Sequence, residues 1–168
     1  HYSTPLEGKN RGRGVASGYW FNIGLKSSVT LHVNTDGTVN LIEGSTDIGG
    51  TRTSIAMQAA EVLGIPAEDI NPAVVDTDSV GYTGVTGGSR TTFATGYAAI
   101  EAAKDVVQQM KTFAADLWEV ESDGVTFEDG TFKSLNGQTP QASFKELAEE
   151  VDKTIVGSTS GTKALVLN

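Results

Sequence analysis

The sequence has 168 residues, no cysteine, a formal net charge of −9 and 38% hydrophobic residues. This length and apolar content are typical of one domain with a packed core. The lack of cysteine excludes disulfides, thiolate metal sites and a cysteine nucleophile, and the lack of a basic stripe argues against nucleic acid as a partner. No apolar run approaches the roughly 20 residues of a membrane-spanning helix. We therefore expect no membrane partner and take the cytoplasm as the default location.

The first quarter of the chain is predicted to contain an arm and a hairpin. Residues 1–13 are polar and rich in glycine and charge, which predicts a flexible arm. The segment Val15–Ile23 mixes small and aromatic residues and is compatible with a strand. Two β-rich segments, Ser28–Asn34 and Thr38–Glu43, flank the dipeptide Asp36-Gly37, which is favoured in tight turns because glycine tolerates positive φ.

Two helices are predicted in the middle of the chain. The first covers Thr53–Leu63 and is stopped by Gly64. A short strand at Ala73–Val75 and a loop rich in Gly, Thr and Ser over Asp78–Gly88 lead to a long helix over Thr91–Glu119. Apolar residues recur in both at helical spacing. The predicted apolar sides are Ile55, Met57, Ala59, Val62 and Leu63 in the first helix, and Phe93, Tyr97, Ile100, Val107, Met110, Ala114 and Leu117 in the second.

The last third of the chain predicts a small hairpin, a short helix and a final strand. The hairpin pairs Val125–Glu128 with Thr131–Ser134, the helix covers Ser143–Val151, and the strand covers Thr154–Ser158. Strands and helices interleave, but a hairpin opens the order. We therefore expect an α+β fold, a two-layer α/β sandwich with a mixed β-sheet and one long helix, in a single domain over residues 14–168.

One short pattern occurs twice, each time at the start of a predicted helix. It reads Gly49-Gly50-Thr51-Arg52-Thr53 and Gly87-Gly88-Ser89-Arg90-Thr91. A helix start has N–H groups without intrahelical partners and a partial positive charge. Glycines allow a ligand to approach the backbone closely, and arginine offers a planar fork that fits phosphate oxygens. Two such starts side by side would bind an extended anion such as a pyrophosphate.

Two other interpretations of this repeat remain open. Serine and threonine are common helix caps, so both junctions could belong to a purely structural or assembly domain. Alternatively, the chain could be a non-catalytic module that binds phosphate or a nucleotide through the same two helix starts. Neither junction has the lysine of a Walker A loop or the spacing of a dinucleotide-binding loop. His1 and His32 lack clustered carboxylates, so no protein metal site is expected.

Longer segments around the repeat resemble a known family. The first is Gly44-Ser45-Thr46-Asp47-Ile48-Gly49-Gly50-Thr51, followed by a helix that ends in Gln58-Ala59-Ala60-Glu61-Val62-Leu63-Gly64-Ile65-Pro66. The second is Thr86-Gly87-Gly88-Ser89-Arg90-Thr91-Thr92, with Asp76-Thr77 between the two. Together they are similar to an interior domain of the molybdopterin-binding large subunit of molybdenum hydroxylases, the xanthine dehydrogenase and aldehyde oxidase family. The similarity covers roughly residues 28–103.

The resemblance implies a role in binding the molybdenum cofactor, usually in its molybdopterin cytosine dinucleotide form in bacteria. Gly49, Gly50 and Thr51, with Arg52, would lie beside the pterin and the oxo ligands of the metal. Thr86, Gly88, Ser89, Arg90 and Thr91 would hold the phosphate or pterin portion. The cofactor's own sulfurs bind the molybdenum in this family, so the resemblance implies no protein ligand to the metal.

The resemblance also implies a larger parent enzyme. That enzyme would hydroxylate an aldehyde or an N-heterocycle and pass electrons to Fe–S and flavin subunits or domains, and the remaining domains of the large subunit would pack against this one. Two departures bear on activity. The family's glutamine in the first loop is Gly50 here, and the family's general-base glutamate has no counterpart in this chain. We therefore expect no catalytic residue and no activity in the isolated chain. Whether the isolated chain binds the cofactor or none at all is left open by the sequence.

Overall fold

A four-stranded mixed sheet forms one layer of the fold. The computed structural model describes residues 6–73, 75–135, 140–151 and 155–163. The sheet has the strand order β3-β2-β1-β7, and its strands are β1 (Lys26–Val33), β2 (Val39–Glu43), β3 (Ile70–Ala73) and β7 (Val156–Lys163). β1 pairs with β2 and β7 in antiparallel fashion, and β2 pairs with β3 in parallel. The hairpin predicted around Asp36-Gly37 is confirmed, with Gly37 at φ 82° in the turn.

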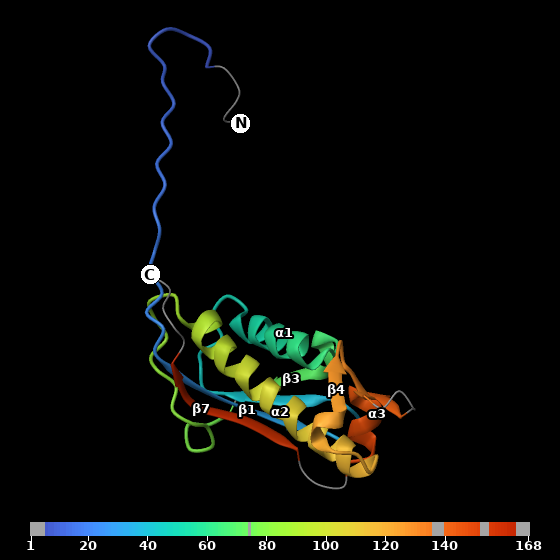
Figure 1. Ribbon diagram of the computed structural model, residues 1–168. Helices are drawn as coiled ribbons and strands as arrows, with labels where there is room; N and C mark the ends of the chain where they lie inside the picture. Colours follow the sequence, from blue (N-terminus) through green and yellow to red (C-terminus); the bar gives the residue numbers. More distant parts are fainter. Residues whose placement is uncertain (1–5, 74, 136–139, 152–154, 164–168) are drawn as a thin grey trace.

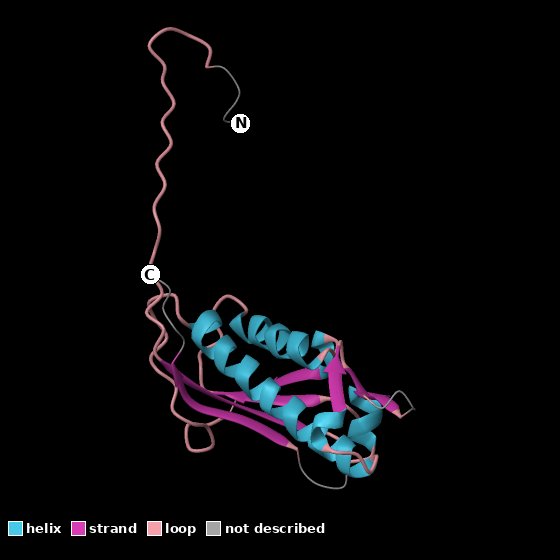
Figure 2. Ribbon diagram, in the orientation of Figure 1, coloured by secondary structure: helices cyan, strands magenta, loops and turns pink. Residues whose placement is uncertain are grey.

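Two helices form the second layer and lie on one face of this sheet (Figure 1). They are α1 (Thr51–Leu63) and α2 (Gly96–Leu117), and a five-residue π-helical turn (η2, Thr91–Thr95) leads directly into α2. The α+β class, the mixed sheet and the long helix are therefore confirmed (Figure 2). No helix in the described ranges combines the length and the apolar character that crossing a bilayer would require.

A smaller antiparallel sheet lies at the far end of α2. It has the order β4-β5-β6, with β4 (Val125–Glu128), β5 (Thr131–Ser134) and β6 (Gln141–Ser143). The sheet continues into a short helix, α3 (Phe144–Glu149), which begins with a capping box between Ser143 and Glu146. Two single 3₁₀ turns, Ala67–Asp69 and Ser122–Gly124, precede β3 and β4. This smaller sheet lies away from the helix starts and so supports the core rather than the candidate site.

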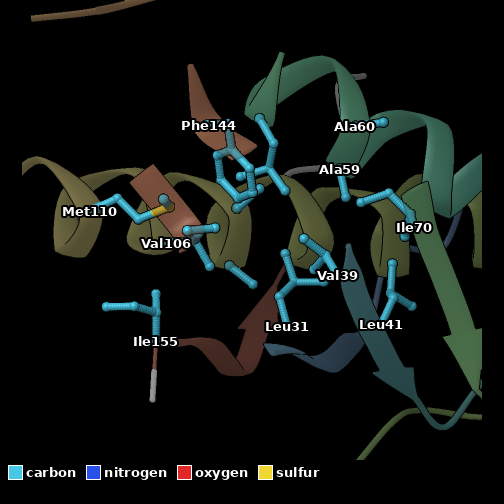
Figure 3. Packing of buried hydrophobic residues seen from close by; sticks show 14 of the residues in the cluster. Leu31, Val39, Leu41, Ala59, Ala60, Ile70, Val106, Met110, Phe144 and Ile155 are labelled. Atoms are coloured by element: carbon cyan, nitrogen blue, oxygen red, sulfur yellow. The ribbon is translucent and has the colours of Figure 1, made fainter. Parts of the chain in front are cut away.

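The core lies between the large sheet and the two helices (Figure 3). Leu31, Val39 and Leu41 of the sheet point toward Ala59 of α1 and Val106 of α2. The buried stripe of α2 consists mainly of alanines, at positions 98, 99, 102, 103, 114 and 115. The predicted apolar side of α2 was therefore partly wrong, because Phe93, Tyr97 and Leu117 are exposed. Small residues replace them in the core because they let α2 approach both α1 and β7 closely.

The N-terminal part of the chain departs from the sequence prediction. Residues 6–25 contain no helix or strand. Most of this segment extends away from the body (Figure 1), whereas Asn22, Ile23 and Gly24 contact it. The prediction of a strand at Val15–Ile23 is wrong, because the segment pairs with no strand in the described residues. It makes a backbone hydrogen bond from the Ile23 N–H to the Gly88 carbonyl at 3.2 Å. Tyr19, Trp20 and Phe21 are exposed there.

Several predicted boundaries shift by a few residues. α1 begins at Thr51 instead of Thr53, and β3 ends at Ala73 where the strand was predicted to begin. β6, which was not predicted, pairs with β5 just before α3. The last strand runs on to Lys163. The predicted start of this strand, residue 154, lies outside the described residues.

Candidate functional site

The two glycine-containing helix starts lie at the same end of the molecule, next to the base of the arm (Figure 1). Thr51 of the first start and Ser89 of the second line the same pocket. Further along α1, Gln58 Nε2 donates to the carbonyl of Thr92 in η2 at 3.3 Å. Gly96 makes room for this contact, since a Cβ there would lie 1.7 Å from Gln58 Oε1. The fold thus brings the two copies of the repeated pattern together, as the sequence led us to expect.

The start of α1 is closed by its own loop. The Thr51 hydroxyl accepts from the Ile48 N–H at 3.1 Å and donates to the Thr46 carbonyl at 3.2 Å. An Asp47 carboxylate oxygen accepts from the Arg52 N–H at 3.2 Å. An internal carboxylate therefore satisfies this helix start and reduces its attraction for a second anion.

The two glycines before Thr51 leave this loop open on its outer side. Gly49 and Gly50 have φ of 62° and 80°, the left-handed region that favours glycine. A Cβ built on either would meet no atom within 4 Å. The backbone here is therefore accessible to a ligand, and side chains are excluded by conformation rather than by lack of space.

The start of α2 is open and rich in hydroxyl groups. Ser89 is a non-glycine residue with φ 55°, a conformation that costs about 1–2 kcal/mol and is concentrated at functional sites. The Ser89 carbonyl accepts from Asn22 Nδ2 at 2.7 Å, so the segment just before β1 holds Ser89 in place. Within the described ranges, the hydroxyls of Thr86, Ser89, Thr91 and Thr92 have no hydrogen-bond partner in the protein.

A pocket of about 410 Å³ lies between the two starts and collects these hydroxyls. Its lining residues are Ile48, Thr51, Thr86, Gly87, Ser89, Arg90, Thr91 and Thr92. No carboxylate belongs to this described lining. Hydroxyls, a helix start and a nearby cation form a donor set that fits an anionic, oxygen-rich ligand.

Arg90 lines the pocket, but its guanidinium is committed to the protein. The side chain is 0% exposed. Nε donates to the Gly24 carbonyl at 2.6 Å, and Nη1 donates to the Gly84 carbonyl at 2.9 Å. Nη2 donates to the Lys26 carbonyl at 2.9 Å and to Ser27 Oγ. The sequence predicted that the Arg90 guanidinium binds phosphate oxygens. In the structure it binds three backbone carbonyls instead, where the segment before β1, the start of β1 and the loop at Gly84 meet.

The charge of Arg90 still acts on the pocket. Burial lowers the pKa of Arg90, yet an arginine keeps its proton because its ordinary pKa lies far above neutrality. Within the described part of the chain, no carboxylate lies within salt-bridge distance of it. A buried positive charge beside the pocket favours an anion there without any direct contact.

Arg52, the matching arginine of the first start, has a different environment. Its side chain is 17% exposed, and Nε lies 3.9 Å from Oε1 of the buried Glu43. Neither of these two atoms has a hydrogen-bond partner among the described residues. Arg52 is outside the pocket lining, as are Gly49, Gly50 and Gly88. The pocket instead includes Ile48, Gly87 and Thr92, which lie in the quoted motifs but were not among the predicted cofactor-binding residues.

Comparison with known proteins identifies the domain. The sequence model of the family described as molybdopterin cofactor-binding domain matches residues 3–164. The chain belongs to this family. The match includes nearly all of the N-terminal arm, residues 1–13. It also confirms the resemblance to large subunits of the xanthine dehydrogenase and aldehyde oxidase group.

Relatives of this molybdopterin cofactor-binding domain are parts of larger proteins. The chain is 43% identical over 60 residues to the aldehyde oxidoreductase molybdenum-binding subunit PaoC of Escherichia coli strain K12, which covers 35% of the chain and 8% of that subunit. It is 30% identical over 154 residues to the 6-hydroxypseudooxynicotine dehydrogenase complex subunit gamma of Paenarthrobacter nicotinovorans, which covers 89% of the chain and 19% of that subunit. The chain thus spans less than a fifth of either relative.

A solved structure agrees with the fold of the molybdopterin cofactor-binding domain. Reconstituted CO dehydrogenase from Oligotropha carboxidovorans matches with a TM-score of 0.73 and 25% identity, over 82% of this chain and 18% of that chain. The similarity extends over most of the residues described above, so the arrangement of two helices on a mixed sheet is common to both proteins.

Proposed function

We propose that this domain holds part of the molybdopterin cofactor in the large subunit of a molybdenum hydroxylase. The parent enzyme would hydroxylate an aldehyde or an N-heterocycle. Membership of the cofactor-binding family supports the first statement. The second is supported by the names of the relatives, which include an aldehyde oxidoreductase subunit and a nicotine 6-hydroxylase large subunit.

The pocket with unpartnered hydroxyls between the two helix starts is the observation that carries this proposal. Ser89, Thr91 and Thr86 would donate to phosphate or pterin oxygens, and Thr92 would extend the same row. Gly49 and Gly50 would let the ligand lie against bare backbone beside Thr51. When bound, the cofactor would supply the redox chemistry of the molybdenum, which its own sulfurs hold.

Gly50 has a consequence for the chemistry of this site. The family places a glutamine in this loop, where this chain has Gly50. Gly50 has no side-chain donor, and its φ of 80° does not suit a residue with a side chain. Position 50 would therefore border the cofactor without directing a side-chain hydrogen bond at it. We expect the donor that orients substrate near the metal to come from another part of the parent subunit.

The partners of the domain follow from the same proposal. The remaining domains of the large subunit would complete the cofactor site, and Fe–S and flavin subunits or domains would accept the electrons. A cytosine dinucleotide form of molybdopterin would use the pocket hydroxyls for its pyrophosphate. The isolated chain would be inactive because it holds one part of the site and no general base.

The test is the molybdenum and pterin content of the full-length parent, purified with its partners from a host that makes the cofactor. A Ser89→Ala, Thr91→Val double variant removes two pocket hydroxyls with little change in volume. Thr112→Val is the matched control, since Thr112 is exposed on α2 far from the pocket and bonds only to the Gln108 carbonyl among the described residues.

Each outcome of this test separates the alternatives. Molybdenum with a pterin dinucleotide in the wild-type parent and in the control, with at least about tenfold less in the double variant, supports the proposal; one lost charge-assisted hydrogen bond alone corresponds to roughly this factor. A parent free of molybdenum and pterin that still binds a free nucleotide would favour the phosphate-binding module. A parent that binds neither would favour the structural domain.

A further inference from the structure

The buried polar side chains of this domain are gathered at the helix starts. Those in the described residues are Ser27, Ser28, Glu43, Ser45, Thr51, Arg90, Thr91 and Thr95. The remainder of the buried core is apolar. Burying a polar group costs free energy unless it is hydrogen-bonded. This concentration at one end therefore indicates that the polar groups are held in a specific arrangement beneath the pocket.

Three hydroxyls form a chain across the gap between the two helix starts. Ser27 Oγ of β1 lies 2.9 Å from Thr95 Oγ1 of η2. Thr95 Oγ1 in turn lies 2.7 Å from Ser45 Oγ, in the loop that leads to α1. Ser27 and Thr95 are 0% exposed and Ser45 is 4% exposed. Thr95 is thus the central member, with a partner from each side.

A charged group lies next to the chain at each end. The Arg90 guanidinium donates to Ser27 Oγ. At the other end, the Ser45 N–H donates to a Glu43 carboxylate oxygen. A guanidinium only donates, so Ser27 Oγ accepts from Arg90 and its own proton is available to Thr95 Oγ1. The Glu43 carboxylate binds the Ser45 backbone and does not accept from a hydroxyl of the chain. The network joins the buried cation of the second start to the buried carboxylate beneath the first.

We propose that Thr95 and Ser45 are positioning residues that set the separation of the two helix starts and thereby the shape of the pocket toward an anionic ligand. The inference rests on the proposed function for the identity of that ligand. Thr95 lies one turn after Thr91, which lines the pocket, and Ser45 lies in the loop that delivers Thr51. The wide π-helical turn at Thr91–Thr95 is a device found often at functional sites. Here it brings the Thr95 hydroxyl to the Ser45 loop.

The experiment uses a hydroxyl deletion and its conservative rescue in the full-length parent. Thr95→Val keeps the volume and removes the hydroxyl, Thr95→Ser keeps the hydroxyl, and Ser45→Ala removes the partner from the other side. Thr112→Val is the control for the same chemical change, made on α2. Two quantities are measured: molybdenum per subunit in the holoenzyme, and the Kd of inorganic pyrophosphate for the cofactor-free protein from a host that does not make the cofactor.

We expect Thr95→Val and Ser45→Ala to lose molybdenum and to raise the pyrophosphate Kd about tenfold, the size of effect expected from one misplaced charge-assisted hydrogen bond. Thr95→Ser and Thr112→Val should stay within about twofold of wild type. If Thr95→Val does not fold, Ser45→Ala decides the question, because it changes a loop rather than a helix. Wild-type molybdenum content and Kd in Ser45→Ala and in any folded Thr95→Val would overturn the proposal.

The two proposals fail differently in this experiment. A wild-type parent without molybdenum, whose pyrophosphate Kd still responds to Thr95→Val and recovers in Thr95→Ser, would overturn the cofactor assignment and support the positioning role. A parent with molybdenum that responds to none of the three variants would keep the assignment and overturn the positioning role. A parent with neither molybdenum nor pyrophosphate binding would overturn both.

Discussion

Arg90 and Arg52 occupy equivalent positions in the two helix starts, and replacing each with lysine tests their separate roles. Lysine keeps the positive charge but concentrates its donors on one atom. Arg90 uses three nitrogens to reach oxygens of Gly24, Lys26, Gly84 and Ser27. The Lys26 carbonyl also accepts from the Gly84 N–H, and Ser27 Oγ also bonds to Thr95 Oγ1. An ammonium at the end of a shorter side chain cannot span the Gly24 and Gly84 carbonyls, so Arg90→Lys leaves at least one buried oxygen without a donor.

The free energies of unfolding follow from these contacts. Each unsatisfied buried acceptor costs about 1–3 kcal/mol, so we expect Arg90→Lys to lose about 1–3 kcal/mol. Arg52 makes one ion pair at 3.9 Å and is partly exposed. Lysine can replace that contact, so Arg52→Lys should lose less than about 1 kcal/mol. Domain stabilities of about 5–15 kcal/mol make the difference measurable.

The assay is urea denaturation of the 168-residue chain, followed by far-UV circular dichroism and fitted with a common m value. Arg90→Lys should shift the midpoint to clearly lower urea, and Arg52→Lys should leave it nearly unchanged. Equal shifts for the two variants, or a loss below about 0.5 kcal/mol for Arg90→Lys, would refute the conclusion that the Arg90 fork holds the pocket loop together.

Three further predictions concern the scaffold. Gly64→Ala places a Cβ 2.0 Å from the Gly130 nitrogen at a φ of 61°, so it should cost more than about 3 kcal/mol in the same titration; a loss below about 1 kcal/mol would contradict this packing. Leu31→Ala, at the centre of the large sheet, should cost about 2–5 kcal/mol, and a loss below about 0.5 kcal/mol, the size typical of surface substitutions, would contradict its burial. Hydrogen bonds from the Ser143 N–H and hydroxyl lower the pKa of Glu146. The contribution of Glu146 to the stability of the fold is therefore present above about pH 4.5 and is lost as the pH falls through the lower pKa of the folded state. The difference in Tm between wild type and Glu146→Gln should be present at pH 7 and vanish at low pH, and a pH-independent difference would contradict the capping box.

Local patterns were sufficient to predict most elements and the place of the candidate site. Glycine and hydroxyl residues before each helix are local signals, so both helix starts were visible in the sequence. Their adjacency follows from two helices on the same face of one sheet. The openness of Gly49 and Gly50, and the pocket position of Ser89 and Thr91, agree with the residue types at those positions.

Tertiary contacts explain what the sequence did not reveal. The same Arg-Thr pattern occurs at both starts, yet Arg90 is buried among carbonyls and Arg52 is partly exposed, because β1 and the arm's base pass beside only the second start. The contact between Ser45 and Thr95 joins residues 50 positions apart and has no local signature. Phe93 and Tyr97 recur at helical spacing but are exposed, because the side of α2 that packs closely against the core is the one with the alanines.

A structure of the full-length parent with its cofactor bound would test most directly whether the pocket between the two helix starts holds part of the cofactor. We expect cofactor density in the pocket between the two helix starts, with phosphate or pterin oxygens within hydrogen-bond distance of Ser89 and Thr91. The Arg90 guanidinium should still bind the carbonyls of Gly24, Lys26 and Gly84. A cofactor bound elsewhere, with this pocket filled by another segment of the subunit, would contradict this expectation.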